Sequence, residues 1–371
     1  MHIARVKLAY PASATASEAR TPTMRIAQVA PLIESVPPAS YGGTERVVAY
    51  LTDELVRLGH DVTLFASGDS RTSATLVPVS PRSLRLDAAC IDHIAWHVLL
   101  VERVAAAASQ FDLLHFHIAH IHLPVIRRLS TRSVMTLHGR LDLPDLPPLF
   151  TEFSDVPLIS ISDAQRAPLP HVNWMGTIRH GLPPDQLAPR YEPGGYLAFL
   201  GRISPEKRVD RAIAIATALG EPLKIAAKVD RADAAYFARE IEPLMKNPLV
   251  DFVGEIGEAG KNEFLGNARA LLFPIDWPEP FGLVMIEALA CGTPVVAFRG
   301  GSVEEIIEDG VTGFIVDTVD GAIEATRRVK TLDRRACRRA FERRFTARRM
   351  AEDHVALYGR ILETKTAHAA A

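Results

Sequence analysis

Two glutamates eight residues apart, Glu279 and Glu287, flank the start of a predicted helix. They belong to the segment PIDWPEPFGLVMIEALACGTPVVA (274–297), whose apolar stretch predicts a helix over 283–290. Carboxylates accept hydrogen bonds from hydroxyls, so this pair suggests a sugar beside one carboxylate and a ribose diol beside the other. A capped helix with two solvated acids is the structural alternative that the spacing alone leaves open.

The start of this helix is itself a candidate anion site. Its first backbone N–H groups, those of Phe281, Gly282 and Leu283, have no carbonyl partner inside the helix and lie at the positive end of the helix dipole. Such groups bind phosphate readily. We therefore expect a phosphate of a ligand to lie between the two glutamates.

A second candidate phosphate site follows a predicted strand in the segment LGRISPEKRVDR (200–211). Ser204 is expected to cap a helix that has Pro205 at its first position. Arg202 and Lys207 lie on either side of this turn, where two cations can neutralise a diphosphate. On its own the pattern also fits a solvated helix start. Combined with the two glutamates, it indicates a site for a diphosphate.

The first half of the chain contributes three further candidates. Gly42 and Gly43, in YGGTE (41–45), let the backbone approach a ligand at another helix N-terminus, although a flexible turn fits the same fragment. His138, in TLHG (136–139), ends a predicted strand, and its imidazole can donate to a phosphate or a sugar hydroxyl. We expect all three residues to face the same cleft.

A run of histidines, HFHIAHIH (115–122), suggests a metal site, because His115 and His117 share one face of a strand. No cysteine or paired acid accompanies them. Polar histidines at a strand end that line the cleft are therefore the preferred interpretation.

The elements that must position these residues alternate regularly between strand and helix. A strand at 25–30, a helix at 44–58 and a strand at 61–66 form a βαβ unit, which indicates a parallel sheet. The alternation restarts with a strand at 196–200, after a segment rich in proline and glycine at 181–195 that is typical of a linker. The sequence thus predicts an α/β protein with two tandem Rossmann-like domains and a cleft between them.

The predicted domain boundaries follow from this pattern. Residues 1–23 are expected to be a disordered extension, 24–185 the acceptor-side domain and 186–345 the nucleotide-sugar-binding domain. Residues 346–371 hold a C-terminal helix.

Composition excludes several other classes of protein. The 371 residues are 48% hydrophobic and 23% charged, which indicates a packed globular chain. Because 42 basic and 44 acidic residues nearly cancel, a nucleic-acid partner is not expected. Three separated cysteines and the lack of a long apolar run favour a cytoplasmic protein. No G-x-G-x-x-G follows a strand and no G-x-x-x-x-G-K-[ST] occurs, which argues against a dehydrogenase and an ATPase.

Together these motifs resemble a family 4 glycosyltransferase (GT4) of the GT-B fold over about residues 24–362. The resemblance rests on E-x7-E within EPFGLVMIEALACGTPVVA, on GRISPEK, YGG and TLHG, and on VTGFIVD (311–317). It implies a retaining transfer of a hexose from a nucleotide-diphosphate sugar to a hydroxyl of a glycan, a lipid-linked acceptor or a small molecule. The chain has no D-x-D, the acid pair that anchors metal in metal-dependent sugar transferases, so neither a metal nor a cofactor is expected.

The resemblance also assigns roles. It implies that Glu279 contacts the donor sugar and Glu287 the ribose, while Arg202 and Lys207 bind the diphosphate. It implies further that His138 and Gly43 complete the site. One departure occurs in IRHGL (178–182), where the family commonly has Asn before Gly and this chain has His180.

The C-terminal part of the chain carries a strong positive charge. Residues 327–349 contain eleven Arg or Lys and two acids. A solvated helix face is the preferred interpretation, and peripheral contact with the inner face of a membrane is the alternative. In GT-B relatives, a helix like the one predicted at 346–362 crosses back to the first domain.

Two other functions remain open on the same fold. A sugar-phosphate synthase or sugar-nucleotide isomerase differs only in what enters the acceptor side of the cleft. A non-catalytic nucleotide-sugar-binding subunit is disfavoured, because a degenerate relative need not keep Arg202, Lys207, Glu279 and Glu287 together.

Overall fold

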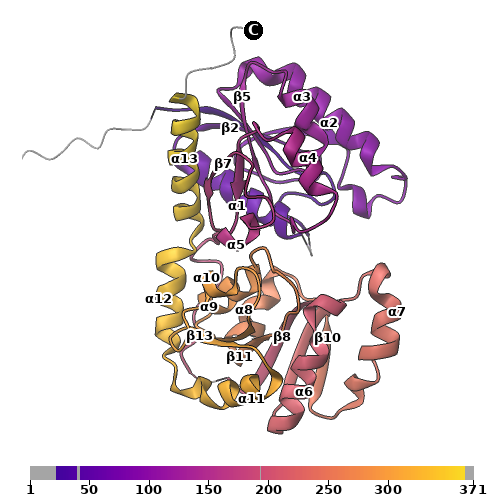
Figure 1. Ribbon diagram of the computed structural model, residues 1–371, viewed down its shortest axis with the longest axis vertical. Coiled ribbons are helices and arrows are strands. Elements are labelled where there is room, and N and C mark those ends of the chain that lie inside the picture. The colour runs from indigo at the N-terminus through magenta and orange to yellow at the C-terminus, as the bar shows by residue number, and fades with distance from the viewer. Residues whose placement is uncertain (1–21, 40–41, 193, 364–371) are drawn as a thin grey trace, which may run out of the picture.

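A computed structural model describes residues 22–39, 42–192 and 194–363. It has two parallel sheets, one above the other, which belong to the first and second halves of the chain (Figure 1). The prediction of two tandem Rossmann-like domains is confirmed. The predicted extension lies outside the described residues except for its last two positions, and its disorder stays a prediction.

The first sheet has seven parallel strands in the order β3-β2-β1-β4-β5-β6-β7. These strands are β1 (Arg25–Val29), β2 (Asp61–Ser67), β3 (Thr75–Ser80), β4 (Leu113–Phe116), β5 (Arg132–Thr136), β6 (Leu158–Ser160) and β7 (Trp174–Thr177). The connecting helices are α1 (Gly43–Arg57), α2 (His93–Ala107), α3 (Leu123–Ile126), α4 (Leu146–Glu152) and α5 (Asp163–Arg166).

The second sheet has six parallel strands in the order β10-β9-β8-β11-β12-β13. These strands are β8 (Tyr196–Arg202), β9 (Leu223–Lys228), β10 (Val250–Gly254), β11 (Ala268–Phe273), β12 (Val295–Phe298) and β13 (Gly313–Val316). Its helices are α6 (Val209–Leu219), α7 (Ala234–Tyr236), α8 (Glu258–Gly266), α9 (Leu283–Ala290), α10 (Val303–Ile306), α11 (Val319–Arg328) and α12 (Arg334–Arg344).

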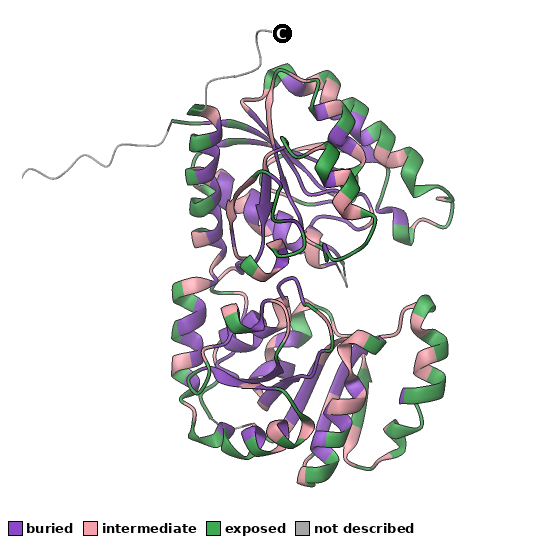
Figure 2. Ribbon diagram, in the orientation of Figure 1, coloured by how far each residue is buried: buried purple, intermediate pink, exposed green. Residues whose placement is uncertain are grey.

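The central strands are buried on both faces, as Figure 2 shows. This explains why they read in the sequence as continuous apolar runs instead of alternating patterns. For example, every residue of β4 and of β12 is buried. The sheets therefore form rigid platforms, and the loops at the carboxyl ends of their strands are left to form the site.

The last helix, α13 (Ala347–Glu363), packs against α1 of the first half of the chain. Its residues Met350, Leu357 and Tyr358 belong to the same apolar cluster as Ile26 and Leu51. Figure 1 shows α12 beside the second sheet and α13 beside the first. The exact boundaries at 185/186 and 345/346 stay a prediction.

Two local expectations were wrong. Ser204 makes no side-chain cap, and Pro205–Lys207 forms a single 3-10 turn instead of the start of a helix. Arg208 follows it with a φ of 52°, and only then does α6 begin. Within the residues that the structure describes, every helix is too short or too polar to cross a bilayer.

Candidate active site

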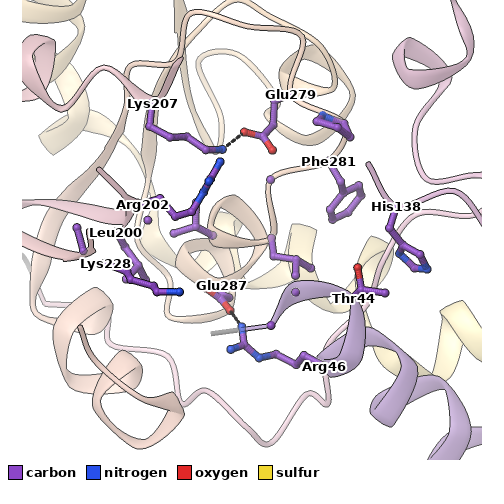
Figure 3. A pocket seen from close by; sticks show the side chains of 18 of the residues that line it. Thr44, Arg46, His138, Leu200, Arg202, Lys207, Lys228, Glu279, Phe281 and Glu287 are labelled. Carbon is purple, nitrogen blue, oxygen red and sulfur yellow. Dashed lines mark hydrogen bonds and ion pairs between the residues drawn. The ribbon is translucent and has the colours of Figure 1, made fainter. Parts of the chain in front are cut away.

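A cavity of about 510 Å³ lies between the carboxyl ends of the two sheets (Figure 3). The structure brings all of the predicted site residues into its wall, namely Gly42, Gly43, His138, Arg202, Lys207, Glu279, Phe281, Gly282, Leu283 and Glu287. Their individual roles stay predictions. The shared location supports one site built from both halves of the chain.

Glu279 and Lys207 form an ion pair in the cavity wall (Figure 3). The indole Nε1 of Trp277 donates to the same carboxylate over 3.0 Å, and the Lys207 ammonium lies 4.8 Å from the centroid of the indole ring. Lys207 and Glu279 side chains are only 16% and 9% exposed. The pair therefore holds a positive and a negative group at fixed positions in the wall of the cavity.

Backbone contacts explain why these two distant residues meet. The N–H of Asp276 donates to the carbonyl of Glu206, which joins the turn before α6 to the loop that carries Glu279. Ser302 supports this loop from behind, because its N–H donates to the carbonyl of Glu279 over 2.9 Å. At Gly301, with φ of 53°, a Cβ would lie 2.1 Å from that carbonyl oxygen, so no larger residue fits.

Glu287 is buried and carries two cationic partners. Lys261 Nζ lies 2.6 Å from its Oε1, and Arg46 Nη1 reaches the same oxygen over 3.3 Å. Burial by itself raises the pKa of this carboxyl, but the charges of Lys261 and Arg46 outweigh burial, so its pKa is lowered. Glu287 therefore stays ionised and is able to accept hydrogen bonds from a diol.

Arg202 lies at the end of β8, on the cavity wall near Lys207. Its guanidinium contacts Glu206 over 2.9 Å and Asp230 over 3.7 Å. Lys228, another lining residue, contacts Asp230 over 2.7 Å. These cations lie together on the wall formed by the second sheet.

Two helices begin at the cavity. Helix α9 begins at Leu283, as predicted, behind Gly282, whose φ of 78° favours glycine. Helix α1 begins at Gly43, and a Cβ on Gly43 would lie 3.6 Å from the Leu283 side chain. Gly42 is required for space, since a Cβ there would lie 2.8 Å from Pro38. Both helix starts thus direct N–H groups toward the cavity.

His138 is half-buried at the edge of a group of histidines. Its Nε2 lies 2.9 Å from Nδ1 of His117, and its ring stacks on His180 with centroids 5.3 Å apart. Burial lowers the pKa of His138 to about 3, so the ring is neutral near pH 7. His180, the departure from the family pattern, packs between His138 and Phe281.

The metal interpretation of the histidine run gains no support. His115 and His117 lie behind His138 instead of in the cavity wall, which corrects the expectation that they line the cleft. Among the described residues, no group of three or more His, Cys, Asp or Glu is arranged to hold a metal ion.

Several lining residues were not anticipated. Lys261 and Arg46, the partners of Glu287, and Trp277, the partner of Glu279, belong to this group. Trp277 was within the quoted motif and could have been noticed as the only indole donor there. Lys261 and Arg46 have no local signal, because they reach Glu287 only through the tertiary fold.

Both halves of the chain match known families of glycosyltransferases. Residues 188–342 match the family Glycosyl transferases group 1, and residues 41–174 match Glycosyltransferase Family 4. A D-inositol 3-phosphate glycosyltransferase of Mycolicibacterium vanbaalenii is 29% identical over 215 residues, which are 53% of this chain and 46% of that protein. The chain spans less than half of the length of the first curated relatives that it matches.

Solved structures share the fold over nearly the whole chain. AviGT4, a glycosyltransferase involved in avilamycin A biosynthesis, is 25% identical with a TM-score of 0.69, covering 91% of this chain and 98% of that chain. HepE of Anabaena, in complex with UDP and glucose, is 16% identical with a TM-score of 0.67, covering 91% of this chain and 100% of the other.

Proposed function

Because the chain belongs to the group 1 and family 4 glycosyltransferases of the GT-B fold, we propose that it is a retaining hexosyltransferase. Its donor is a nucleoside-diphosphate sugar and its acceptor is a hydroxyl of a glycan, a lipid-linked saccharide or a small molecule. The curated relative that acts on D-inositol 3-phosphate and the relative that holds UDP and glucose support this class of reaction.

One observation carries the proposal: two carboxylates and two cations converge on a single cavity that also receives the start of α9. In this proposal Lys207 and Arg202 bind the diphosphate, and the first N–H groups of α9 add positive charge. Glu287, kept ionised by Lys261, accepts from the ribose. Glu279 is then left for hydroxyls of the sugar.

The same groups supply what the reaction needs. As the bond from the anomeric carbon to the diphosphate breaks, negative charge grows on the leaving oxygen, and Lys207 and Arg202 stabilise it. The acceptor oxygen bonds to the anomeric carbon on the same face, and its proton passes to the departing phosphate. Since protein cations carry the charge, we propose a reaction that needs no metal ion.

The opposite wall of the cavity is the proposed acceptor side. Glu34, Glu45 and Arg85 line it from the first half of the chain. Burial raises the pKa of Glu45 to about 6. Carboxyl groups here provide acceptors for the hydroxyls of a polyol or sugar.

The arginines of residues 327–349 are largely paired within the protein, which argues against the proposal that this segment contacts a membrane. Arg334 and Arg338 donate to backbone carbonyls inside the protein. Arg343 and Arg344 both contact Glu308. Much of the positive charge of this segment is therefore neutralised or buried.

Thermal unfolding with UDP, GDP and ADP tests the donor site. A nucleotide at 100 times its dissociation constant adds about 2.7 kcal/mol to the free energy of unfolding. We expect Lys207→Ala to lose most of this gain, because a charge-assisted contact contributes about 1.5–3 kcal/mol. Lys224→Ala is the matched control, since Lys224 lies on β9 of the same sheet and pairs with Asp251 outside the cavity.

The test is completed by incubating the protein with sugar donors of whichever nucleotide stabilises it and identifying the products. Release of nucleoside diphosphate together with a glycosylated acceptor supports the transferase. Absence of stabilisation by all three nucleotides, or equal stabilisation of wild type and Lys207→Ala, contradicts the assigned site. A phosphorylated sugar product would instead identify the synthase alternative.

A further inference from the structure

A continuous chain of buried hydrogen bonds connects His138 with the last helix. His138 Nε2 lies 2.9 Å from His117 Nδ1, and His117 Nε2 lies 2.7 Å from Gln28 Oε1. The amide nitrogen of Gln28 lies 3.3 Å from the hydroxyl of Tyr358, on α13. The chain thus begins at the cavity and ends on an element more than 200 residues away in the sequence.

The orientation of Gln28 sets the direction of this chain. Its Oε1 only accepts, so His117 must carry its proton on Nε2. Burial lowers the pKa of His117 well below its ordinary value, so the ring has one proton and its Nδ1 holds a lone pair. His138 must then donate from Nε2, which leaves the lone pair of this neutral ring on Nδ1.

The contacts beyond Tyr358 agree with this direction. The Tyr358 hydroxyl accepts from Gln28 and has one proton to give, and His115 Nδ1 lies 2.6 Å away. His115 then carries its proton on Nε2, which lies 2.7 Å from Thr136 Oγ1. Each hydrogen bond from Gln28 to Thr136 therefore pairs one donor with one acceptor.

The reverse direction is less favourable at the end that faces the cavity. Nδ1 of His138 is enclosed and has no partner among the described residues. In the reverse direction this atom would be a buried N–H without an acceptor, and buried orphan N–H groups are rarer than unsatisfied acceptors. With the observed orientation of Gln28, the same atom is an enclosed lone pair, which is the less costly of the two unpartnered states.

We propose that Tyr358 is a positioning residue for His138, because its hydroxyl, through Gln28 and His117, holds His138 in the tautomer that carries the proton on Nε2. His138 then has no N–H left to donate to a bound sugar or acceptor, because its Nε2–H is given to His117 and its Nδ1 is enclosed, a step that rests on the proposed function. This differs from the donating role that the sequence suggests for His138.

Nitrogen NMR of the full chain labelled with [15N]histidine reads the tautomer directly and needs no activity. The signals of His138 are identified by their loss in His138→Gln. We expect a protonated Nε2 and an unprotonated Nδ1 in the wild type. A protonated Nδ1 with an unprotonated Nε2 would overturn the proposal.

Two variants interrupt the chain. Tyr358→Phe keeps the buried ring but removes the hydroxyl, and Gln28→Met removes the amide if the first variant does not fold. In either variant we expect signals of both neutral tautomers of His138. His354→Gln is the matched control, because His354 is a buried residue of the same helix whose ring packs beside His115 and Tyr358 but hydrogen-bonds to the Met350 carbonyl and to no member of the chain. A single unchanged tautomer in the variants would contradict the role of Tyr358.

Kinetics separate this proposal from the proposed function. We expect Tyr358→Phe to lower kcat about tenfold while the dissociation constant of UDP stays within about twofold, because Tyr358 lies outside the donor cavity. If the wild type transfers no sugar, the proposed function fails but the tautomer is still measured. If the tautomer changes and kcat does not, the positioning role fails alone.

Discussion

Arg46 and Glu287 meet across the cavity, with Arg46 Nη1 3.3 Å from Glu287 Oε1. Arg46 lies on α1 of the first half of the chain, and Glu287 lies on α9 of the second. A second ion pair from Arg46 Nη2 to Glu258 spans 2.7 Å. The carboxylate proposed to bind the ribose therefore also ties the two halves of the chain together.

Replacing Arg46 should loosen this arrangement. We expect Arg46→Met to increase the radius of gyration of the ligand-free protein in X-ray scattering, since two ion pairs between the halves are lost. Removing one partner of a buried pair should also lower the free energy of unfolding by about 3 kcal/mol. Arg25→Met is the control, because Arg25 pairs with Asp112 inside the first half. Identical scattering by Arg46→Met and wild type would show that other contacts hold the halves together.

The two glutamates should give different phenotypes. Glu279→Gln should lower turnover strongly and leave the affinity for free nucleoside diphosphate near the wild-type value, because that ligand has no sugar for Glu279 to contact. Glu287→Gln should weaken binding of both the free nucleotide and the intact donor, since each contains the ribose. It should also destabilise the protein, because Lys261 and Arg46 lose their buried counter-charge.

Calorimetric titration of both variants with nucleoside diphosphate separates these roles. Unfolding curves recorded alongside ensure that each variant is titrated in its folded state. Loss of nucleotide affinity in Glu279→Gln with retention in Glu287→Gln would mean that the assigned roles are reversed.

Activity should survive EDTA. The leaving diphosphate is proposed to be stabilised by Lys207, Arg202 and the start of α9, so a divalent ion is not needed for charge. The rate of nucleotide release should stay within about twofold of the untreated value. Complete loss of activity that one added divalent ion restores would refute the metal-independent mechanism.

Acidification should destabilise the protein through its buried histidines. Burial lowers the pKa of His138 to about 3 and of His354 to about 4. Below about pH 6.5 these histidines become protonated in the unfolded chain but stay neutral in the folded protein. The free energy of unfolding therefore decreases as the pH is lowered. Each of these two histidines should cost about 2 kcal/mol at pH 5 and nothing above about pH 7. Glu45, with its raised pKa, opposes this loss in part.

Urea unfolding at pH 7.5 and pH 5 measures this effect. Between the two pH values, His354→Gln should show a smaller decrease in the free energy of unfolding than the wild type. The reason is that it lacks one histidine that stays neutral when folded and becomes protonated when unfolded. An equal drop in both proteins would mean that His354 is protonated in the folded state at pH 5.

The sequence predicted the fold and the content of the cavity well, because both depend on local patterns. The apolar run after Gly282 predicted a helix over 283–290, and α9 has these bounds. Glycines and charged residues at strand ends must gather where parallel strands end, so Arg202, Glu279 and His138 were placed correctly without any knowledge of distances.

Other features depend on tertiary contacts that leave no local pattern. Nothing near Lys261 shows that it contacts Glu287, which lies 26 residues further along the chain. The helix expected to begin at Pro205 is instead a 3-10 turn, because Arg208 adopts a left-handed conformation held by ion pairs to Asp210 and Asp276. The sequence pattern placed Tyr358 only on the apolar side of the last helix. The structure shows that its hydroxyl contacts Gln28 and His115.

The return of α13 to the first sheet matters for anyone who exchanges domains between relatives. A chimera made by replacing residues up to the linker would keep Met350, Leu357 and Tyr358 from one parent and face them with a foreign apolar surface and a foreign Gln28. The unit that can be swapped is thus discontinuous in sequence: the first half of the chain must travel together with its last helix. Exchange of the proposed acceptor side of the cavity therefore needs two crossover points instead of one.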